Sequence, residues 1–251
     1  MKHLSSLAVG GALFAIAGPA TAQTAPPAAV TVTGGATLVT DYRFRGLSQT
    51  DRSVAVQATA TAQHRSGLYA SFWGSSIDDY IANGSDAELD LIGGYRKTVG
   101  GTTVDGGMLY YVYPHNGGGN TDFFEPYISV AHTIGPVSAK VGGNFAWKQH
   151  GLGLTGERRG GGYVYGELSA GIPTTPVTVT GHLGHSFTRN YITFGEHYTD
   201  WSAAAAVVVK QVTFGLSYVD TNRDLFSYPR GGGRNKDVSK AGVVGSVGFS
   251  F

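Results

Sequence analysis

The chain has no cysteine in its 251 residues, and charged residues make up only 14% of it. Without cysteine, disulfide bonds and lipid attachment through a thiol are excluded, so backbone pairing and packing must hold the fold together. A typical soluble domain carries about 25% charged residues, so this deficit indicates a surface that faces something other than water. The formal net charge of +1 gives no reason to expect a nucleic acid as a partner.

Long apolar runs are also scarce. The run at residues 4–16 follows Lys2 and His3 and precedes a small-residue triplet that ends at Ala22, a pattern typical of a secretory signal peptide cut after that alanine. No later stretch approaches the roughly 20 apolar residues that a membrane-spanning helix needs. We therefore expect a signal peptide at residues 1–22 and a single domain at residues 23–251, which would cross a membrane only as strands.

Glycine, by contrast, is abundant, with 39 residues, and short segments alternate between apolar and polar positions. Glycine at this level suits the bends of a tightly curved sheet. Alternating segments of roughly ten residues, bounded by turn signals, predict about twelve strands. The predicted strands are residues 37–45, 53–63, 68–75, 88–97, 103–113, 123–132, 137–148, 163–172, 177–188, 200–209, 212–220 and 240–251.

The predicted connections alternate between short turns and long loops. Short turns are expected near residues 65–67, 100–101, 134–136, 173–176 and 210–211, with long loops between them. A soluble β-sandwich, the alternative fold for these strands, has no need of this alternation. Single-chain outer-membrane barrels have short periplasmic turns and long extracellular loops. The predicted fold class is therefore all-β, a transmembrane antiparallel β-barrel of about 12 strands.

The final segment has the pattern of a closing barrel strand. Every second position from Ala241 to Phe251 is apolar or small, which places those side chains on one face. A terminal aromatic residue on such a strand resembles the signal read by the barrel-insertion machinery of the outer membrane of Gram-negative bacteria. We therefore expect this machinery, outer-membrane lipid and lipopolysaccharide as partners.

Aromatic residues on the apolar face cluster near the predicted strand ends. This distribution indicates two girdles at the membrane interfaces, where rings with a polar tip are stable. The girdle residues are expected to be Tyr42, Phe44, Tyr95, Tyr110, Trp147, Trp201, Tyr218 and Phe249.

The opposite face of the predicted strands is polar, as the lumen of a barrel requires. The residues expected to line the lumen or contact a solute are Arg43, Arg45, Glu88, Asp90, Arg96, Tyr111, Glu125, Lys148 and Lys240. Strand pairing puts Glu88, Asp90 and Glu125 in an acidic arc. Arg43, Arg45 and Lys240 form a basic arc on the opposite wall. The two arcs predict either a constriction that orients dipolar solutes or a salt-bridged interior plug.

Catalytic and metal sites find little support. His182 and Ser186 share a strand face but lie roughly 13 Å apart, beyond the reach of a nucleophile and its base. His185 and Ser186 face opposite sides. Asp78, Asp79 and Asp86 do not match a calcium-loop spacing. No phosphate-binding loop or zinc-ligand spacing is present. We expect neither an enzyme nor a cofactor.

Several motifs, taken together, resemble the TorF-like porin family of proteobacteria. The resemblance covers about the first half of the mature chain and implies an outer-membrane β-barrel of the porin class without an assigned substrate. The motifs are the segment from Asp41 to Asp51, Ser66-Gly67-Leu68-Tyr69 with Trp73-Gly74-Ser75, Glu88-Leu89-Asp90-Leu91 with Gly93-Gly94-Tyr95, Tyr110-Tyr111-Val112-Tyr113-Pro114, and Glu125-Pro126-Tyr127.

The sequence thus predicts a porin-like outer-membrane channel for passive diffusion of small hydrophilic solutes or ions through a charge-lined lumen. The alternative is a closed barrel, with a structural role or with loops that bind partners, and without channel activity. A lipid-modifying enzyme is a third hypothesis.

Overall fold

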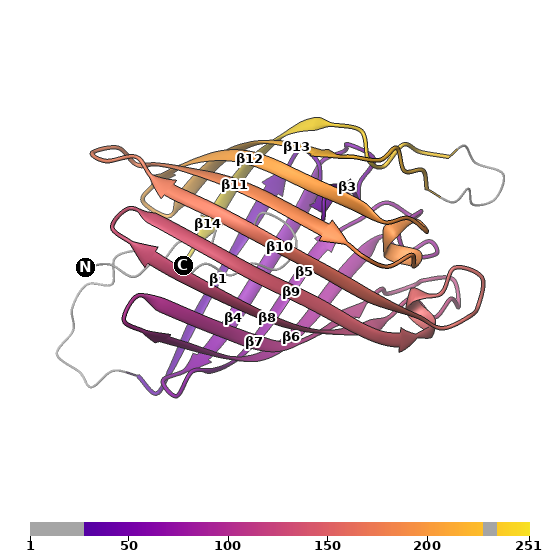
Figure 1. Ribbon diagram of the computed structural model, residues 1–251, viewed down its shortest axis with the longest axis horizontal. Coiled ribbons are helices and arrows are strands. Elements are labelled where there is room, and N and C mark those ends of the chain that lie inside the picture. Colours follow the sequence, from indigo (N-terminus) through magenta and orange to yellow (C-terminus); the bar gives the residue numbers. More distant parts are fainter. Residues whose placement is uncertain (1–27, 228–234) are drawn as a thin grey trace.

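The computed structural model describes residues 28–227 and 235–251, so the predicted signal peptide at residues 1–22 lies outside the described residues. Twelve strands close into one antiparallel barrel, with β1 pairing to β14 (Figure 1). The barrel strands are β1 (Val30–Val39), β4 (Ala55–His64), β5 (Leu68–Ser76), β6 (Ala87–Val99), β7 (Thr102–Val112), β8 (Phe123–Ile134), β9 (Val137–Gln149), β10 (Arg159–Gly171), β11 (Val177–Ser186), β12 (Tyr198–Val209), β13 (Val212–Thr221) and β14 (Gly242–Ser250). The predicted fold class is confirmed.

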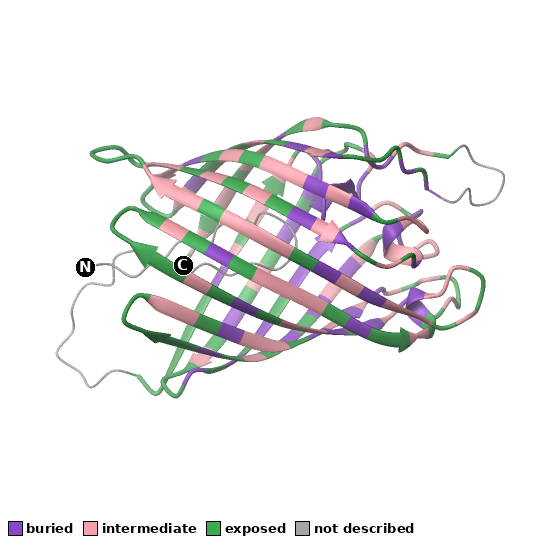
Figure 2. Ribbon diagram, in the orientation of Figure 1, coloured by how far each residue is buried: buried purple, intermediate pink, exposed green. Residues whose placement is uncertain are grey.

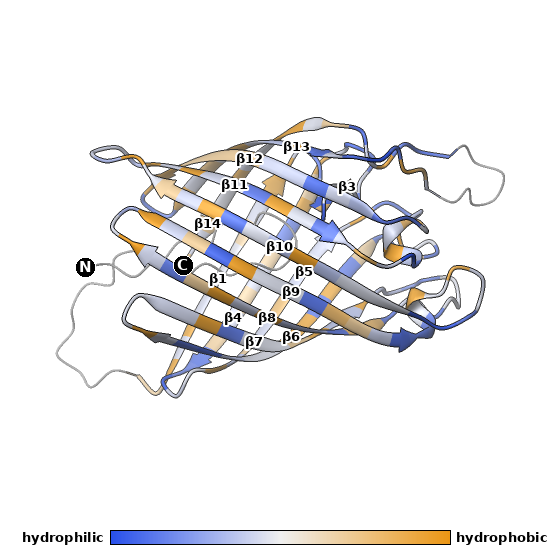
Figure 3. Cartoon of the chain, in the orientation of Figure 1, coloured by the Kyte–Doolittle hydropathy of each residue, from blue (hydrophilic) through white to orange (hydrophobic). Residues whose placement is uncertain are grey.

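Alternation along the strands separates an apolar outer face from an inner face. Leu38, Val56, Leu91, Ile128 and Leu216 point outward, and each is more than half exposed. Figure 3 shows the corresponding alternation of hydrophobic and hydrophilic bands along the strands. Such a period of two puts every second side chain on the same side of the wall.

Short turns and long connections lie at opposite ends of the barrel. The turns at residues 65–67, 100–101, 135–136, 172–176 and 210–211 define what we call the turn end. The other connections define the loop end (Figure 1), and two of them contain short 3₁₀ helices, η1 (His150–Leu152) and η2 (Tyr191–Thr193). None of the helices in the described part of the chain is long and apolar enough to cross a membrane.

The first predicted strand, residues 37–45, is wrong at both ends. Strand β1 ends at Val39, and the chain then leaves the wall and folds into the barrel as a hairpin of β2 (Arg43–Phe44) and β3 (Leu47–Ser48). Every residue from 41 to 50 is buried, and we call this segment the plug hairpin. Its two-residue turn has positive φ at Arg45 (47°) and Gly46 (83°), as a turn that matches the twist of a β-hairpin requires.

The plug hairpin carries much of the apolar core. Tyr42 and Phe44 are 2% and 6% exposed, so their predicted place in an outer aromatic girdle is wrong. Tyr42 lies against Trp73 with ring centroids 5.3 Å apart, and Phe44 meets Tyr111 edge-on at 6.1 Å. Figure 2 shows buried residues gathered toward the loop end. The core therefore lies inside the barrel, under the long loops.

The other predicted girdle residues fall into two groups. Tyr95, Trp147, Tyr218 and Phe249 are 43–53% exposed on the outer face. Tyr110 and Trp201 are half-buried. Tyr110 stacks on Phe124, with ring centroids 4.2 Å apart.

Candidate functional site inside the barrel

The nine residues predicted to line the lumen separate into buried and exposed sets. Lys148, near the end of β9, and Lys240, just before β14, are exposed. The other seven are buried: Arg43, Arg45, Glu88, Asp90, Arg96, Tyr111 and Glu125.

Arg45 crosses the lumen and contacts the acidic arc directly. Its Nη2 atom lies 2.6 Å from Oε2 of Glu125 on β8, and these side chains are 4% and 0% exposed. The same carboxylate oxygen accepts hydrogen bonds from Tyr111 (3.1 Å) and Asn144 (3.0 Å). The prediction of a basic arc on the far wall is therefore wrong, because the segment that carries Arg43 and Arg45 is the plug and not part of the wall.

Two aromatic rings flank the Arg45 guanidinium. Its Cζ atom lies 4.7 Å from the ring centroid of Phe44 and 4.3 Å from that of Tyr163 on β10. We call Phe44, Glu125 and Tyr163 the Arg45 socket. The neighbouring Gly46 presses on the wall, since a Cβ there would lie 2.7 Å from Thr221 and 2.8 Å from Asp200. Only glycine fits this approach.

A second ion pair fixes the base of the plug hairpin. The Arg43 Nε atom donates to Asp41 at 2.5 Å, and its Nη1 donates to the carbonyl oxygens of Gly46 (3.1 Å) and Lys240 (3.0 Å). Asp41 also accepts a hydrogen bond of 2.6 Å from Ser48. Charge-assisted bonds of this kind are stronger than neutral ones, especially away from water.

Glu88 and Asp90 are buried with little compensation. They are 2% and 1% exposed. Glu88 accepts hydrogen bonds from the Tyr42 hydroxyl at 3.3 and 3.4 Å. The Oδ1 atom of Asp90 has no partner. Within the described residues, neither carboxylate forms an ion pair with Lys or Arg. A cavity of about 20 Å³, room for about one water, lies beside Glu88.

A second polar cluster lies inside the barrel around His182 and Glu167, and these two side chains are more exposed than Glu125. His182 lies between Glu167 (3.4 Å) and Asp200 (3.1 Å), and Lys140 lies 3.6 Å from Glu167. The Glu167 and His182 side chains are 26% and 20% exposed, against 0% for Glu125. In the same cluster, Lys140 and Asp200 are 9% and 3% exposed, so the exposure is confined to Glu167 and His182.

Sequence reasoning missed Tyr163 and Asn144. Tyr163 donates to both Asp200 oxygens at 3.1 Å, lies 2.9 Å from His182 and stacks on Arg45. The signal that could have found them is strand parity, because Tyr163 shares a face with Glu167 and Asn144 shares one with Lys140.

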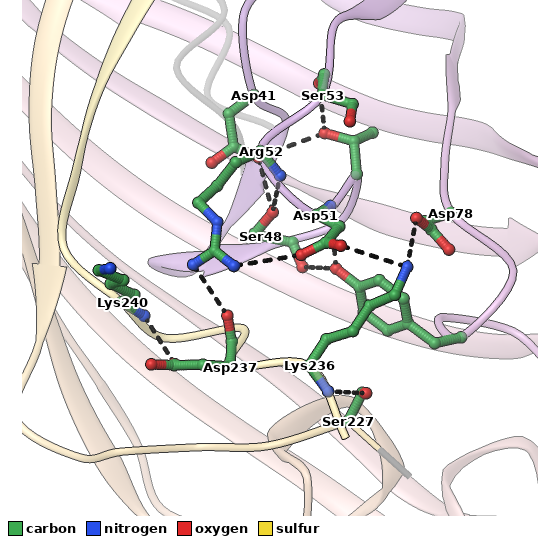
Figure 4. A network of polar contacts seen from close by, with 12 residues as sticks. Asp41, Ser48, Asp51, Arg52, Ser53, Asp78, Ser227, Lys236, Asp237 and Lys240 are labelled. Carbon is green, nitrogen blue, oxygen red and sulfur yellow. Dashed lines mark hydrogen bonds and ion pairs between the residues drawn. The ribbon is translucent and has the colours of Figure 1, made fainter. Parts of the chain in front are cut away.

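At the loop end, the connections that carry Asp78 and Lys236 hold the plug hairpin and Asp51 just after it, so three connections meet there (Figure 4). Lys236 reaches Asp78 at 2.8 Å and Asp51 at 3.3 Å, and its ammonium lies 5.0 Å from the Tyr80 ring centroid. The Tyr80 hydroxyl donates to the Ser48 carbonyl at 2.7 Å. We call this set the three-loop clamp.

Backbone bonds and opposite charges support the clamp. Ser48 N donates to the Val238 carbonyl at 2.8 Å, and Asp78 N donates to the Gln49 carbonyl at 2.8 Å. Burial opposes the charge of Asp78, but hydrogen bonds from Lys236 and Asp79 outweigh it and lower the pKa of Asp78.

No group of three or more His, Cys, Asp or Glu in the described part of the chain is arranged to hold a metal ion. His182 contacts Asp200, Glu167 and Tyr163. These contacts link the inner faces of β10, β11 and β12.

Comparison with known proteins identifies a family and a set of similar folds. The model of the Gcw_chp family, described as a bacterial protein of unknown function, matches residues 22–251. No curated protein matches the chain. This match does not test the resemblance to the TorF-like family, which remains a prediction.

Among solved structures, the chain is similar to the KdgM porin, with a TM-score of 0.55, 8% identity, and coverage of 88% of this chain and 98% of that chain. The NanC porin gives 0.54 and 13%, with coverage of 88% and 99%. The COG4313 outer membrane channel from Pseudomonas putida F1 gives 0.52 and 11%, with coverage of 90% and 96%. At these identities, the similarity establishes the fold.

Proposed function

Since this chain belongs to the Gcw_chp family of bacterial proteins of unknown function, we propose its function from the barrel itself: a porin-like channel of the outer membrane for passive diffusion of small hydrophilic solutes or ions. The turn end faces the periplasm and the loop end faces the cell exterior. Residues 1–22 direct export, and the barrel-insertion machinery assembles the strands next to lipid and lipopolysaccharide.

The observation that carries this proposal is the contrast between the two halves of the lumen. The Glu167 and His182 side chains are 26% and 20% exposed inside the barrel, whereas the carboxylate of Glu125 is fully buried beneath the plug hairpin. A barrel with only a structural role has no need of partly exposed charged side chains in one half of its lumen. We infer that solutes enter this half freely and that the plug hairpin limits passage at the loop end.

Two features support a channel over an enzyme. The wall carries charges on inward positions of several strands, as a pore that sorts solutes by charge requires. The similar folds are porins and channels. One of them is described as the KdgM porin in complex with disordered oligogalacturonate, an acidic saccharide.

The plug hairpin also favours a second candidate function, the closed barrel that presents loops. All ten residues from 41 to 50 are buried, and the three-loop clamp holds them in place. In this alternative, the hairpin stiffens the barrel permanently and the loops are the functional surface.

Conductance separates the two candidates. The refolded mature chain is inserted into a planar bilayer under a salt gradient, beside a variant in which residues 41–50 are replaced by a short Gly-Ser linker. Discrete steps from the native chain, larger in the variant, are the expected result. A native barrel that stays silent while the variant conducts would favour the closed barrel, and silence from both folded proteins would overturn the channel.

A further inference from the structure

The tip of the plug hairpin occupies a site built for a flat cation. The Arg45 guanidinium lies between the rings of Phe44 and Tyr163, with Cζ–centroid distances of 4.7 and 4.3 Å, and its edge meets Glu125 at 2.6 Å. Two aromatic faces with a carboxylate at the edge recognise a planar cation through stacking and a charge-assisted hydrogen bond. An ammonium has no flat face to stack.

The Arg45 socket has unused capacity. Three buried atoms at this level have no hydrogen-bond partner: Glu125 Oε1, Asp90 Oδ1 and Arg45 Nε. Asp90 pairs in register with Tyr111, and the Tyr111 hydroxyl donates to Glu125, so both acids belong to one stretch of wall. Buried polar atoms left unpaired cost free energy. Arg45 therefore meets only part of the hydrogen-bonding capacity of Glu125 and Asp90.

The socket borders the partly exposed side chain of His182. The face of Tyr163 contacts Arg45, while its hydroxyl lies 2.9 Å from His182 Nε2. The His182 side chain is 20% exposed. Tyr163 and Tyr165, whose ring centroids lie 5.8 Å apart, separate the socket from the turn-end half. The clamp contacts described above hold Ser48, Gln49 and Asp51, so the Arg45 side chain can leave without release of the hairpin base.

We propose that the Arg45 socket is a binding site for small solutes that carry a guanidinium group, and that Arg45 occupies it as a tethered competitor. The proposal deepens the proposed channel function by naming its solute class, and rests on that function for the solute's passage. A free guanidinium solute displaces the Arg45 side chain, pairs with Glu125 and stacks on Tyr163.

Binding is tested by calorimetry on the folded, detergent-solubilised barrel with methylguanidinium as the probe. Removal of a tethered competitor, whose effective concentration is in the millimolar range or above, strengthens binding by about tenfold or more. We therefore expect Arg45→Ala to bind methylguanidinium about tenfold or more tightly than the native chain does. Arg65→Ala, which removes an exposed arginine in a turn at the other end, is the matched control and should bind like the native chain.

Two further comparisons define the site and its chemistry. Adding Glu125→Gln to Arg45→Ala should abolish the gain. Methylammonium and neutral urea should bind the Arg45→Ala barrel more weakly than methylguanidinium does. Equal binding of methylammonium would overturn the solute class, and a gain that survives Glu125→Gln would overturn the site. If Arg45→Ala does not refold, Arg45→Gln takes its place in every comparison.

The two proposals fail in different ways. Unchanged affinity in Arg45→Ala, from a native chain that conducts, would overturn the socket and leave the channel. Tighter binding in Arg45→Ala, from a barrel that never conducts, would support the socket as a binding site and overturn its role in transport.

Discussion

Two adjacent glycines of β6 face opposite sides of the barrel wall. A Cβ on Gly94 would lie 2.6 Å from Cζ of Tyr69, whereas a Cβ on Gly93 would meet nothing within 4 Å. Tyr69 cannot move away easily, because its hydroxyl donates to Asp105 at 2.8 Å and also contacts the Tyr127 hydroxyl.

We expect Gly94→Ala to destabilise the barrel by about 1–3 kcal/mol through overpacking. Gly93→Ala should change the free energy of unfolding by less than about 0.5 kcal/mol, as is usual for a substitution that touches nothing. Urea unfolding of both variants in lipid vesicles measures the difference. Equal stability of the two variants would contradict the inward placement of Tyr69.

The buried acids Glu88 and Asp90 lie together in the loop-end half of the lumen. We expect the double substitution Glu88→Gln with Asp90→Asn to shift ion selectivity toward anions at alkaline pH, where both buried carboxyl groups carry a negative charge that no Lys or Arg balances among the described residues. Both changes preserve shape, so folding should persist. The measurement is the reversal potential under a salt gradient.

Asp86→Asn is the matched control for this double variant, since Asp86 lies exposed in the loop before the same strand. Its reversal potential should equal that of the native chain. A double variant that also keeps the native reversal potential would remove Glu88 and Asp90 from the permeation path.

How far the sequence predicts the site depends on the range of each contact. Strand parity alone predicts that Glu88, Asp90 and Glu125 point inward. It cannot predict that Arg45 meets Glu125, because this contact joins residues 80 positions apart and depends on a segment that leaves the wall. For that reason, the prediction of a basic arc on the wall opposite the acidic arc was wrong.

Among the elements, the plug hairpin is the one that differs most from the prediction made from the sequence. Its residues continue the period of two that precedes them, because β2 and β3 are themselves extended strands. An alternating pattern does not distinguish a wall strand from a hairpin buried on both faces. The turn at Arg45 and Gly46 was the available signal, since a two-residue loop ending in glycine favours a tight hairpin.

The three-loop clamp should control how often the plug hairpin moves out of the conducting path. We expect Lys236→Met to raise the frequency of open events, because it removes the ion pairs to Asp78 and Asp51. Lys240→Met is the control, since Lys240 is an exposed residue of the same connection and contributes its carbonyl to Arg43. Single-channel recording compares the two, and equal opening frequencies would exclude the clamp from gating.

The clamp also has a defined pH dependence. The pKa of Asp78 lies below its ordinary value of 3.8, because the hydrogen bonds from Lys236 and Asp79 outweigh the effect of burial. Burial favours the neutral form of Lys236, but its bond to Asp78 outweighs burial and raises its pKa above 10.5. The stabilisation from Asp78 is therefore complete above about pH 5 and lost as the pH falls through its lowered pKa.

The stabilisation from Lys236 is complete below about pH 9 and lost as the pH rises through its raised pKa. We expect constant opening frequency between about pH 5 and pH 9, with a rise on the acid side below about pH 4. The acid rise should be absent in Lys236→Met. Single-channel recordings at stepped pH measure the opening frequency. An acid rise of the same size in Lys236→Met would contradict the assignment of the pH dependence to the clamp.

For the whole molecule, closure depends on the seam between β1 and β14. Five residue pairs join these strands, from Gly35 with Ser250 to Val39 with Ser246. Phe251 extends the seam through bonds between its N–H and the Gly34 carbonyl (2.9 Å) and between the Gly34 N–H and its own carbonyl (3.1 Å).

We expect deletion of Phe251 to impair assembly, because it removes both bonds at the seam and the terminal aromatic residue. The measurement is the yield of folded barrel in outer membranes, read by heat-modifiable migration on gels. Phe251→Tyr, which keeps the ring and both backbone bonds, should assemble at the native level. Native yield of the shortened chain would contradict the role given to the last residue.

The barrel as a whole was predictable because its signals are local. Alternation over about ten residues marks each strand, and the lengths of successive connections fix the pairing order and the two ends. The contents of the lumen were not predictable in the same way. They depend on which distant side chains meet once the ring has closed.

The separation of the plug hairpin from its partners along the chain has a consequence for the order of folding. Arg45 meets Glu125 across 80 residues, Asp78 meets Lys236 across 158, and Arg43 meets the Lys240 carbonyl across 197. Contacts between such distant residues carry a large loop-closure entropy and form late. The plug hairpin comes before most of the barrel strands in the chain, yet it is thus among the last segments to become native. Until it docks, the lumen of the folding barrel stays open at the loop end.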